Sequence, residues 1–231
     1  GREHSFPTRR SSDLVPFAVK AVLYPAGLLA AFAVALYLPL SPSSWDAMTY
    51  HIYIPCRWVQ EGMIFHVPTV FSDISSAFAP LNWELFNAGI MALLKADEFL
   101  KVPGLLLLMI TGLAVSLISR RLGAGGFPSA AAGAFFIVIP PVFENAFSCC
   151  ADIPMTIFLL ISFYGSISYI TEKKDSSAWL AFAAGGLAVG MKTIGPAYAL
   201  PVLATTFFVA AARKNWKMVL FSVPLVIACG G

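Results

Sequence analysis

Residues 102–119 have the sequence VPGLLLLMITGLAVSLIS, eighteen residues without a charged side chain. A helix needs about 20 mostly apolar residues to cross the hydrocarbon core of a bilayer, so this stretch predicts a transmembrane helix. Similar apolar stretches occupy residues 19–38, 127–141 and 153–170, and another begins at residue 218. The run 178–212 is too long for one span and contains the turn signal Gly195-Pro196, which predicts two short helices meeting at Lys192. The pattern predicts an all-α fold, a polytopic bundle of about seven transmembrane helices.

The composition is typical of a membrane protein. Hydrophobic residues make up 58% of the chain and charged residues only 12%, whereas a soluble domain carries roughly 25% charged residues. The net charge of +3 is small, and the sequence has no basic patch that would indicate binding to nucleic acid. The four cysteines lack the spacing of metal ligands, and no nucleotide-binding glycine loop is found.

The first residues have a different origin from the rest. Residues 4–14, HSFPTRRSSDL, have the sequence encoded by one reading frame of a common short-read sequencing adapter. A basic N-terminal tail is the alternative interpretation. Processing and cloning scars are set aside before the fold is considered, so we expect residues 1–14 not to be native. Residues 15–231 then form one transmembrane module, and its last apolar run is expected to continue past Gly231 in the complete protein.

Lysine and arginine in short loops orient a set of transmembrane helices, because cationic loops stay on the cytoplasmic side. Three clusters fall between the predicted spans: Arg120-Arg121, Lys173-Lys174 and Arg213-Lys214-Lys217. With all three in the cytoplasm, residues 41–101, the loop 144–152 and the turn 192–196 lie on the outer side. Residues 81–94 are apolar but short and partly polar, so they predict a helix at the outer surface. We therefore expect a multi-pass protein of the inner (plasma) membrane whose functional site faces the periplasm or exterior.

Asp46 and Asp152 are two acids that stand beside long apolar stretches. An ionisable group near membrane depth is costly, which makes each of them a functional-site hypothesis. Asp46, Tyr50, Tyr53 and Arg57 fall on one face of a predicted helix, although Pro55 is expected to kink or end that helix before Arg57. An acid, a phenol and a guanidinium on one face suit a sugar or a phosphate. In the alternative interpretation, Asp46 belongs to a capping box that Ser43 begins.

The second outer loop and the break at Lys192 supply the other candidates. Asp152 is either the N-cap of the next helix or a functional acid on the same side as Asp46. Glu144 lies in the same predicted loop. Lys192 is either a snorkelling lysine or a cation that holds an anionic headgroup at the outer face. His51, next to Tyr50 in the sequence, is a candidate ligand or base.

Several short motifs, in their order and on their predicted side of the membrane, resemble the C-type (GT-C) membrane glycosyltransferases. This superfamily includes the protein O-mannosyltransferases and the aminoarabinose transferases. The motifs are residues 45–51 (WDAMTYH), 79–83 (APLNW), 120–122 (RRL), 151–154 (ADIP) and 190–195 (GMKTIG). They are similar to the family's first-loop acid, surface helix, cytoplasmic turn, second-loop acid and lysine-containing turn, and the likeness runs from about residue 19 to the C-terminus.

The resemblance implies an inverting transfer of a sugar from a polyprenyl-phosphate donor to an acceptor on a lipid, glycan or protein. Asp46 would be the general base, and Asp152 would assist it by orienting the acceptor or by holding a metal together with Asp46. Lys192 would stabilise the leaving lipid phosphate. The other substrate-binding candidates are Tyr50, His51, Arg57 and Glu144.

The cofactor and the partners follow from the same resemblance. The family has an acidic pair where this chain has the single Asp152, so both a divalent metal and a metal-free reaction remain open. The implied partners are the lipid-linked sugar donor, the bilayer and an acceptor that the sequence does not name, without nucleic acid.

Two functions of other classes are alternatives to the glycosyltransferase. A secondary transporter also uses broken helices and intramembrane charges, but it favours charges at the bilayer midplane and an inverted repeat, and the sequence has neither. A non-catalytic lipid-binding membrane protein would share the apolar helices and the surface loop without any turnover.

Overall fold

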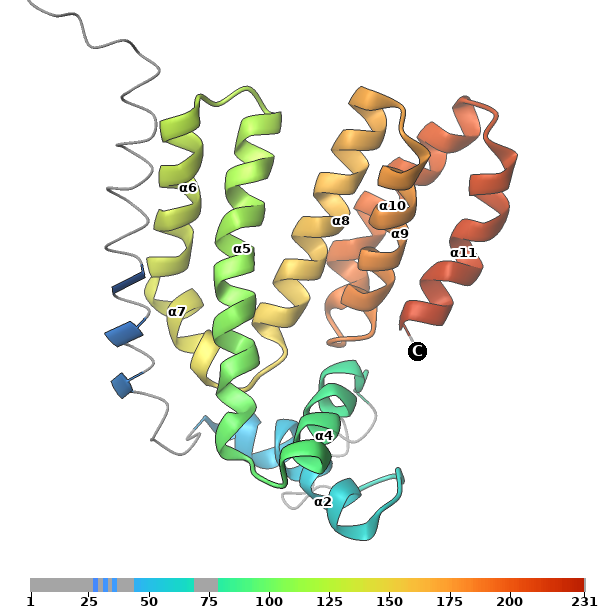
Figure 1. Ribbon diagram of the computed structural model, residues 1–231. Helices are drawn as coiled ribbons and strands as arrows, with labels where there is room; N and C mark the ends of the chain where they lie inside the picture. The colour runs from blue at the N-terminus through green and yellow to red at the C-terminus, as the bar shows by residue number, and fades with distance from the viewer. Residues whose placement is uncertain (1–26, 29–30, 33–34, 37–43, 69–78, 231) are drawn as a thin grey trace, which may run out of the picture.

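The computed structural model describes residues 27–28, 31–32, 35–36, 44–68 and 79–230, and this part of the chain consists of helices joined by turns and short irregular stretches, without a strand (Figure 1). The predicted first span, residues 19–38, lies mostly outside the described residues. The three described pairs within it are helical.

Two short elements and nine helices follow one another in the described part of the chain from residue 44 onward. They are η1 (Ala47–His51), α2 (Tyr53–Glu61), α4 (Asn82–Leu94), η2 (Glu98–Leu100), α5 (Lys101–Arg121), α6 (Gly126–Val138), α7 (Pro140–Phe147), α8 (Asp152–Glu172), α9 (Asp175–Val189), α10 (Gly195–Ala212) and α11 (Trp216–Gly230). The longer helices stand side by side, and α2 and α4 lie together beyond one end of them (Figure 1).

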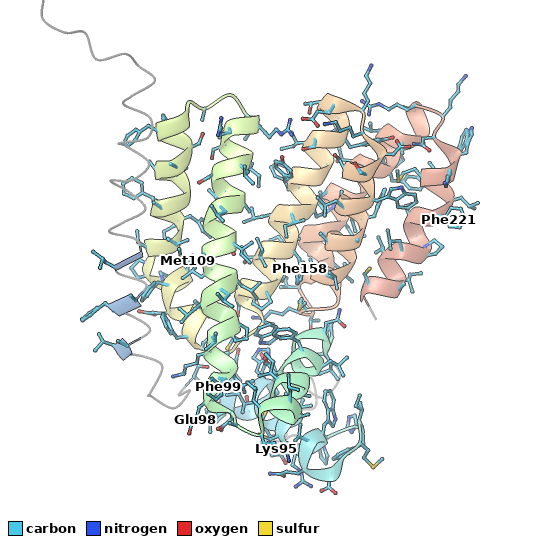
Figure 2. All side chains as sticks on the ribbon, in the orientation of Figure 1. Lys95, Glu98, Phe99, Met109, Phe158 and Phe221 are labelled. Carbon is cyan, nitrogen blue, oxygen red and sulfur yellow. The ribbon has the colours of Figure 1, made fainter. Side chains whose placement is uncertain are left out.

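Three described helices are long and apolar enough to cross a membrane: Glu98–Arg121, Asp152–Glu172 and Gly195–Ala212. The bent pair α6 and α7 would make a fourth span if it crosses as one unit. Large apolar side chains such as Met109 on α5 and Phe221 on α11 are exposed on these helices (Figure 2). A bilayer would cover exposed apolar surface of this extent, which supports the prediction of membrane-spanning helices. The predicted number of about seven spans is not confirmed.

The transmembrane helix predicted at residues 127–141 does not continue unbroken to residue 141. Helix α6 stops at Val138, and α7 begins at Pro140 with a bend of 61° between the two helices. Because the residue before a proline is pushed out of the helical region, Ile139 adopts ψ 121° and breaks the helix. As a result Glu144 lies within α7 and not in a loop.

Small residues allow the helices to approach closely. A Cβ added to Gly165 of α8 would lie 2.7 Å from the Ser177 carbonyl oxygen and 2.9 Å from the Ala181 nitrogen of α9. A Cβ on Gly133 of α6 would overlap the carbonyl oxygen of Gly112 on α5. Close backbone contact of this kind is the usual way in which helices pack within a membrane.

The three cationic loops lie at one end of the bundle. Arg121, at the end of α5, pairs with Glu172 at the end of α8. The guanidinium of Arg213 donates hydrogen bonds to the carbonyl oxygens of Tyr169, at 2.7 Å, and Ile170, at 2.9 Å. These contacts tie the α5–α6, α8–α9 and α10–α11 turns together, at the end opposite to α2 and α4 (Figure 1).

The helix predicted at residues 81–94 is α4, which packs against α2 and against the ends of the longer helices. The run 178–212 also breaks as predicted, because α9 ends at Val189 and α10 begins at Gly195, with Lys192 between them. Both features place chain segments that carry candidate site residues at the same end of the molecule.

Candidate active site

Asp46 immediately precedes a single turn of π-helix, η1, closed by the bond from the Ile52 N–H to the Ala47 carbonyl oxygen at 2.8 Å. A π turn is rare and often occurs at functional sites. Its extra residue shifts the helical register, so the predicted common face of Asp46, Tyr50 and Arg57 is wrong beyond Tyr50. The Ser44 hydroxyl lies 3.3 Å from the Ala47 nitrogen and accepts its N–H at this start, whereas Ser43, which would begin the predicted capping box, lies outside the described residues.

The Tyr50 phenol donates a hydrogen bond to the Asp46 carboxylate. Partial burial raises the pKa of Tyr50 far above its usual value near 10, and the negative charge and hydrogen bond of Asp46 raise the pKa further. The Tyr50 phenol, which is protonated at physiological pH with or without this shift, helps to orient the Asp46 carboxylate.

Asp152 and Lys192 form an ion pair, with 2.7 Å between the Lys192 Nζ and the Asp152 Oδ1. Their side chains are 36% and 30% exposed, so a ligand can reach both. Asp152 is the first residue of α8, and Ala151 occupies the N-cap position, so Asp152 is not the N-cap. Lys192 lies in the break between α9 and α10, so its backbone is not part of a regular helix where its side chain reaches Asp152.

The Ser44 side chain joins the Asp46 segment to the Asp152 segment. The Ser44 hydroxyl donates to the Ser148 carbonyl oxygen at 3.3 Å and lies 3.6 Å from the Cys150 sulfur. Burial raises the pKa of the Cys150 thiol, and the charges of Asp152 and Asp46 raise it further. Cys150 is thus within electrostatic range of both acids, which lie at the same end of the bundle.

His51 is buried, with only 2% of its surface exposed, and its Nδ1 is paired with the carboxylate of Glu84 on α4. The Asn87 side-chain amide donates to the His51 carbonyl oxygen at 3.4 Å. Within the described residues, three buried atoms of this cluster have no hydrogen-bond partner: His51 Nε2, Glu84 Oε2 and Asn87 Oδ1. Sequence reasoning did not select Glu84. The available signal was an acid within the otherwise apolar run 81–94.

Arg57 and Glu144 lie apart from the paired residues. The Arg57 guanidinium donates to Glu61 at 3.0 Å on the exposed side of α2, and Pro55 lies in the first turn of that helix and does not end it. Glu144 is exposed on α7. Among the residues that the structure describes, neither side chain forms a hydrogen bond or ion pair with Asp46, Asp152 or Lys192.

No group of three or more His, Cys, Asp or Glu side chains in the described ranges could hold a metal ion. Asp46 and Asp152 would together supply at most two protein ligands. The thiols of Cys149 and Cys150 are buried and free.

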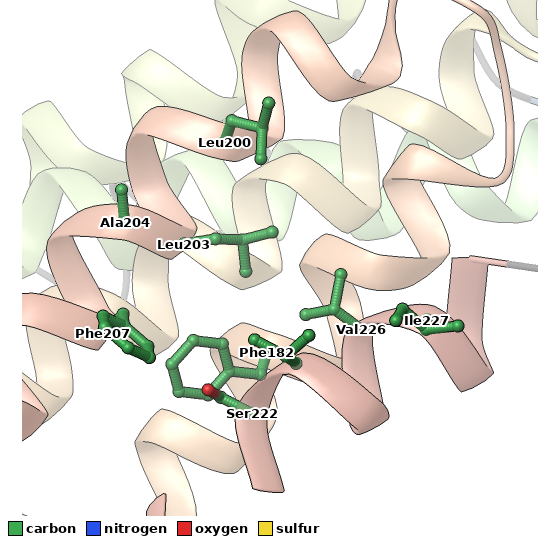
Figure 3. Close-up of a pocket in the computed structure, with 9 residues that line it drawn as sticks. Phe182, Leu200, Leu203, Ala204, Phe207, Ser222, Val226 and Ile227 are labelled. Carbon is green, nitrogen blue, oxygen red and sulfur yellow. The ribbon is translucent and has the colours of Figure 1, made fainter. Parts of the chain in front are cut away.

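A separate apolar groove of about 400 Å³ lies between α9, α10 and α11. Figure 3 shows Phe182 of α9, Leu203 of α10 and Val226 of α11 around it. Its lining has no ionisable side chain, and the Ser222 hydroxyl is satisfied by the Val219 carbonyl oxygen at 3.0 Å. The groove suits a hydrocarbon chain and has no group for acid–base chemistry.

Comparison with known proteins finds no matching family model, no match among curated proteins and no match among solved structures. The likeness to C-type membrane glycosyltransferases therefore rests on the short motifs quoted above.

Proposed function

We propose that the chain belongs to an integral membrane glycosyltransferase with a GT-C-like module of about seven spans. The enzyme would transfer a sugar from a polyprenyl-phosphate donor to an acceptor hydroxyl or amine. The observation that carries this proposal is the presence of Asp46, oriented by Tyr50, at the same end of the bundle as the accessible Asp152–Lys192 pair. A base and a cation are the two groups that an inverting displacement requires.

In this reaction the acceptor oxygen or nitrogen attacks the anomeric carbon of the donor sugar from the face opposite the phosphate. The bond between that carbon and the phosphate oxygen breaks as the new bond forms, and the bonding electrons leave with the polyprenyl phosphate. Asp46 accepts the acceptor's proton, which requires hydrogen-bond reach between the two groups. The Lys192 ammonium stabilises the negative charge that develops on the leaving phosphate.

Asp152 has a second role in the proposal. In the structure its carboxylate neutralises Lys192, so an arriving donor phosphate would exchange with Asp152 at the ammonium. The released carboxylate would then be available to orient the acceptor or to help hold a metal ion. The remaining candidates, Arg57 and Glu144, contribute only if the donor or acceptor extends over α2 or α7.

The reaction would take place at the outer face of the inner (plasma) membrane. Support comes from the three cationic turns at the opposite end of the bundle, because such turns remain cytoplasmic. The apolar groove between α9, α10 and α11 would accommodate the hydrocarbon chain of the lipid donor.

The test is the variant Asp46→Asn in the complete protein, assayed for sugar transfer in membranes. The rate should fall about 100- to 10,000-fold, since that is the usual contribution of a general base. Asp175→Asn is the matched control, because Asp175 accepts a hydrogen bond from Asn215 at the opposite end of the bundle. Undiminished transfer by Asp46→Asn would refute the assignment of the base.

A non-catalytic lipid-binding protein is the second candidate, favoured by the wholly apolar side chains around most of the groove in Figure 3. Such a protein would bind polyprenyl phosphate with the same affinity with and without the Asp46→Asn substitution, and neither form would transfer a sugar. Sugar transfer by the unmodified protein excludes this candidate.

A further inference from the structure

Three consecutive residues at the start of α4 reach the end of α11 and three further segments that are far apart in the sequence. The Asn82 side chain donates to the Cys229 carbonyl oxygen at 3.0 Å, and its backbone N–H donates to the Gly190 carbonyl oxygen at 3.1 Å. The Trp83 indole N–H donates to the Cys149 carbonyl oxygen at 2.7 Å. These three residues, Asn82, Trp83 and Glu84, are called the α4 triplet below.

Glu84 completes the α4 triplet by pairing with the His51 Nδ1 in the π turn. Successive residues of a helix point about 100° apart, so three neighbours in one turn face three directions. Trp83 and Glu84 are 2% and 1% exposed, which means that both contacts are made in the interior. The triplet therefore joins α4 to three separate segments at once.

Two of these segments, those around Gly190 and Cys149, meet the triplet at points where regular helix ends. The Gly190 carbonyl oxygen lies at the C-terminal end of α9, and Cys149 lies between α7 and α8 in a left-handed conformation with φ 59°. Helix ends and irregular turns leave backbone groups that need an outside partner when they are buried. The triplet supplies donors to these carbonyl oxygens and an acceptor to His51.

Each of the same segments also carries one of the groups assigned to the reaction. Lys192 follows Gly190 by two residues, Asp152 follows Cys149 by three, and Asp46 and Tyr50 flank or belong to the turn that contains His51. We propose that Asn82, Trp83 and Glu84 are positioning residues that hold the Lys192 break, the Asp152 turn and the Asp46 turn in one fixed arrangement. This inference rests on the proposed function for its catalytic consequence, but its structural part is independent of turnover.

The structural part is tested by amide hydrogen exchange of the membrane-embedded protein. Asn82→Pro removes the backbone N–H that donates to Gly190, at a first helical position where proline is tolerated, and should speed exchange in residues 190–194. Trp83→Phe should speed exchange in residues 148–151, and Glu84→Met, which removes the acceptor of His51, in residues 47–52. Loss of one buried hydrogen bond predicts an increase of about fivefold in the affected segment. Leu85→Ala is the matched control, because Leu85 is the next residue of α4 and is exposed.

A uniform increase of exchange over the whole chain, or none, would overturn the proposal, because it requires each variant to loosen its own segment. Glu84→Met and Trp83→Phe keep nearly the native shape, so at least one local response remains measurable if another variant does not fold.

The catalytic part is tested by steady-state transfer in the complete protein. Asn82→Pro should raise the donor KM, because it releases the Lys192 break, and Glu84→Met should lower kcat, because it releases the Asp46 turn. A merely structural role would lower kcat in both variants through a smaller active fraction and would leave both KM values unchanged. If the unmodified protein transfers no sugar, the proposed function fails, and the exchange pattern alone decides whether the triplet holds the three segments.

Discussion

Replacement of Lys192 by methionine separates a structural from a functional role of the Asp152–Lys192 pair. The two side chains are about one third exposed, so water screens the pair and its contribution to stability is about 0.2–1 kcal/mol. For a chain of this length such a loss lowers Tm by no more than about 2–4 °C. Lys192→Met should therefore leave the folded protein intact.

Donor binding should respond much more strongly to the same change. A charge-assisted hydrogen bond to a phosphate contributes about 1.5–3 kcal/mol. Since 1.4 kcal/mol is a factor of ten, the donor KM should rise about 10- to 150-fold. The assay measures the initial rate of transfer against the concentration of polyprenyl-phosphate sugar, alongside thermal unfolding of the same preparation.

Lys174→Met is the matched control for this prediction. The Lys174 Nζ pairs with Glu172 at 2.9 Å at the opposite end of the bundle, so its loss removes the same kind of ion pair without touching the site. The donor KM of this control should stay unchanged. An unchanged KM in Lys192→Met, or an equal rise in both variants, would refute the phosphate role of Lys192.

Two further predictions concern packing and protonation. Gly133→Ala should cost about 1–3 kcal/mol in thermal unfolding, because the new methyl group would overlap the Gly112 carbonyl oxygen and push α5 from α6. Gly89→Ala has open space around its Cβ and should not destabilise; equal losses in both variants would contradict the packing argument. The raised pKa of Tyr50 keeps its phenol protonated in the folded protein at a pH near 10, where free tyrosine ionises. Because Tyr50 in the unfolded chain ionises first, the free energy of unfolding should fall as the pH rises above about 10. Ultraviolet titration against Tyr50→Phe measures that pKa, which Asp46→Asn should lower; no change in Asp46→Asn would count against the hydrogen bond between the two residues.

Local sequence features predicted the helices well. The apolar runs at residues 102–119 and 153–170 correspond to α5 and α8, and the break at Lys192 occurs where Gly195-Pro196 indicates it. Hydropathy and turn residues act over a few neighbouring positions, so they are visible in the chain without knowledge of its partners.

The predictions made from neighbouring residues were wrong where the backbone departs from a regular α-helix. The common face extending to Arg57 was wrong because the π turn adds a residue. The loop position of Glu144 was wrong because Ile139 bends the chain before Pro140 and a new helix follows. The π turn has no clear local signature in the sequence, whereas Pro140-Pro141 marks the position of the bend without giving its angle.

The sequence by itself thus determined an all-α protein with membrane-length helices, the two acids at helix starts and a lysine at a break. Only the tertiary structure decided which of these groups meet: Lys192 with Asp152, 40 residues away, and Glu84 with His51, 33 residues away. The physical reason is that hydrophobicity is a property of each segment, whereas an ion pair depends on how separate segments pack. The packing around α4 brings the ends of η1, α8 and α9 together and so makes a site out of scattered polar residues.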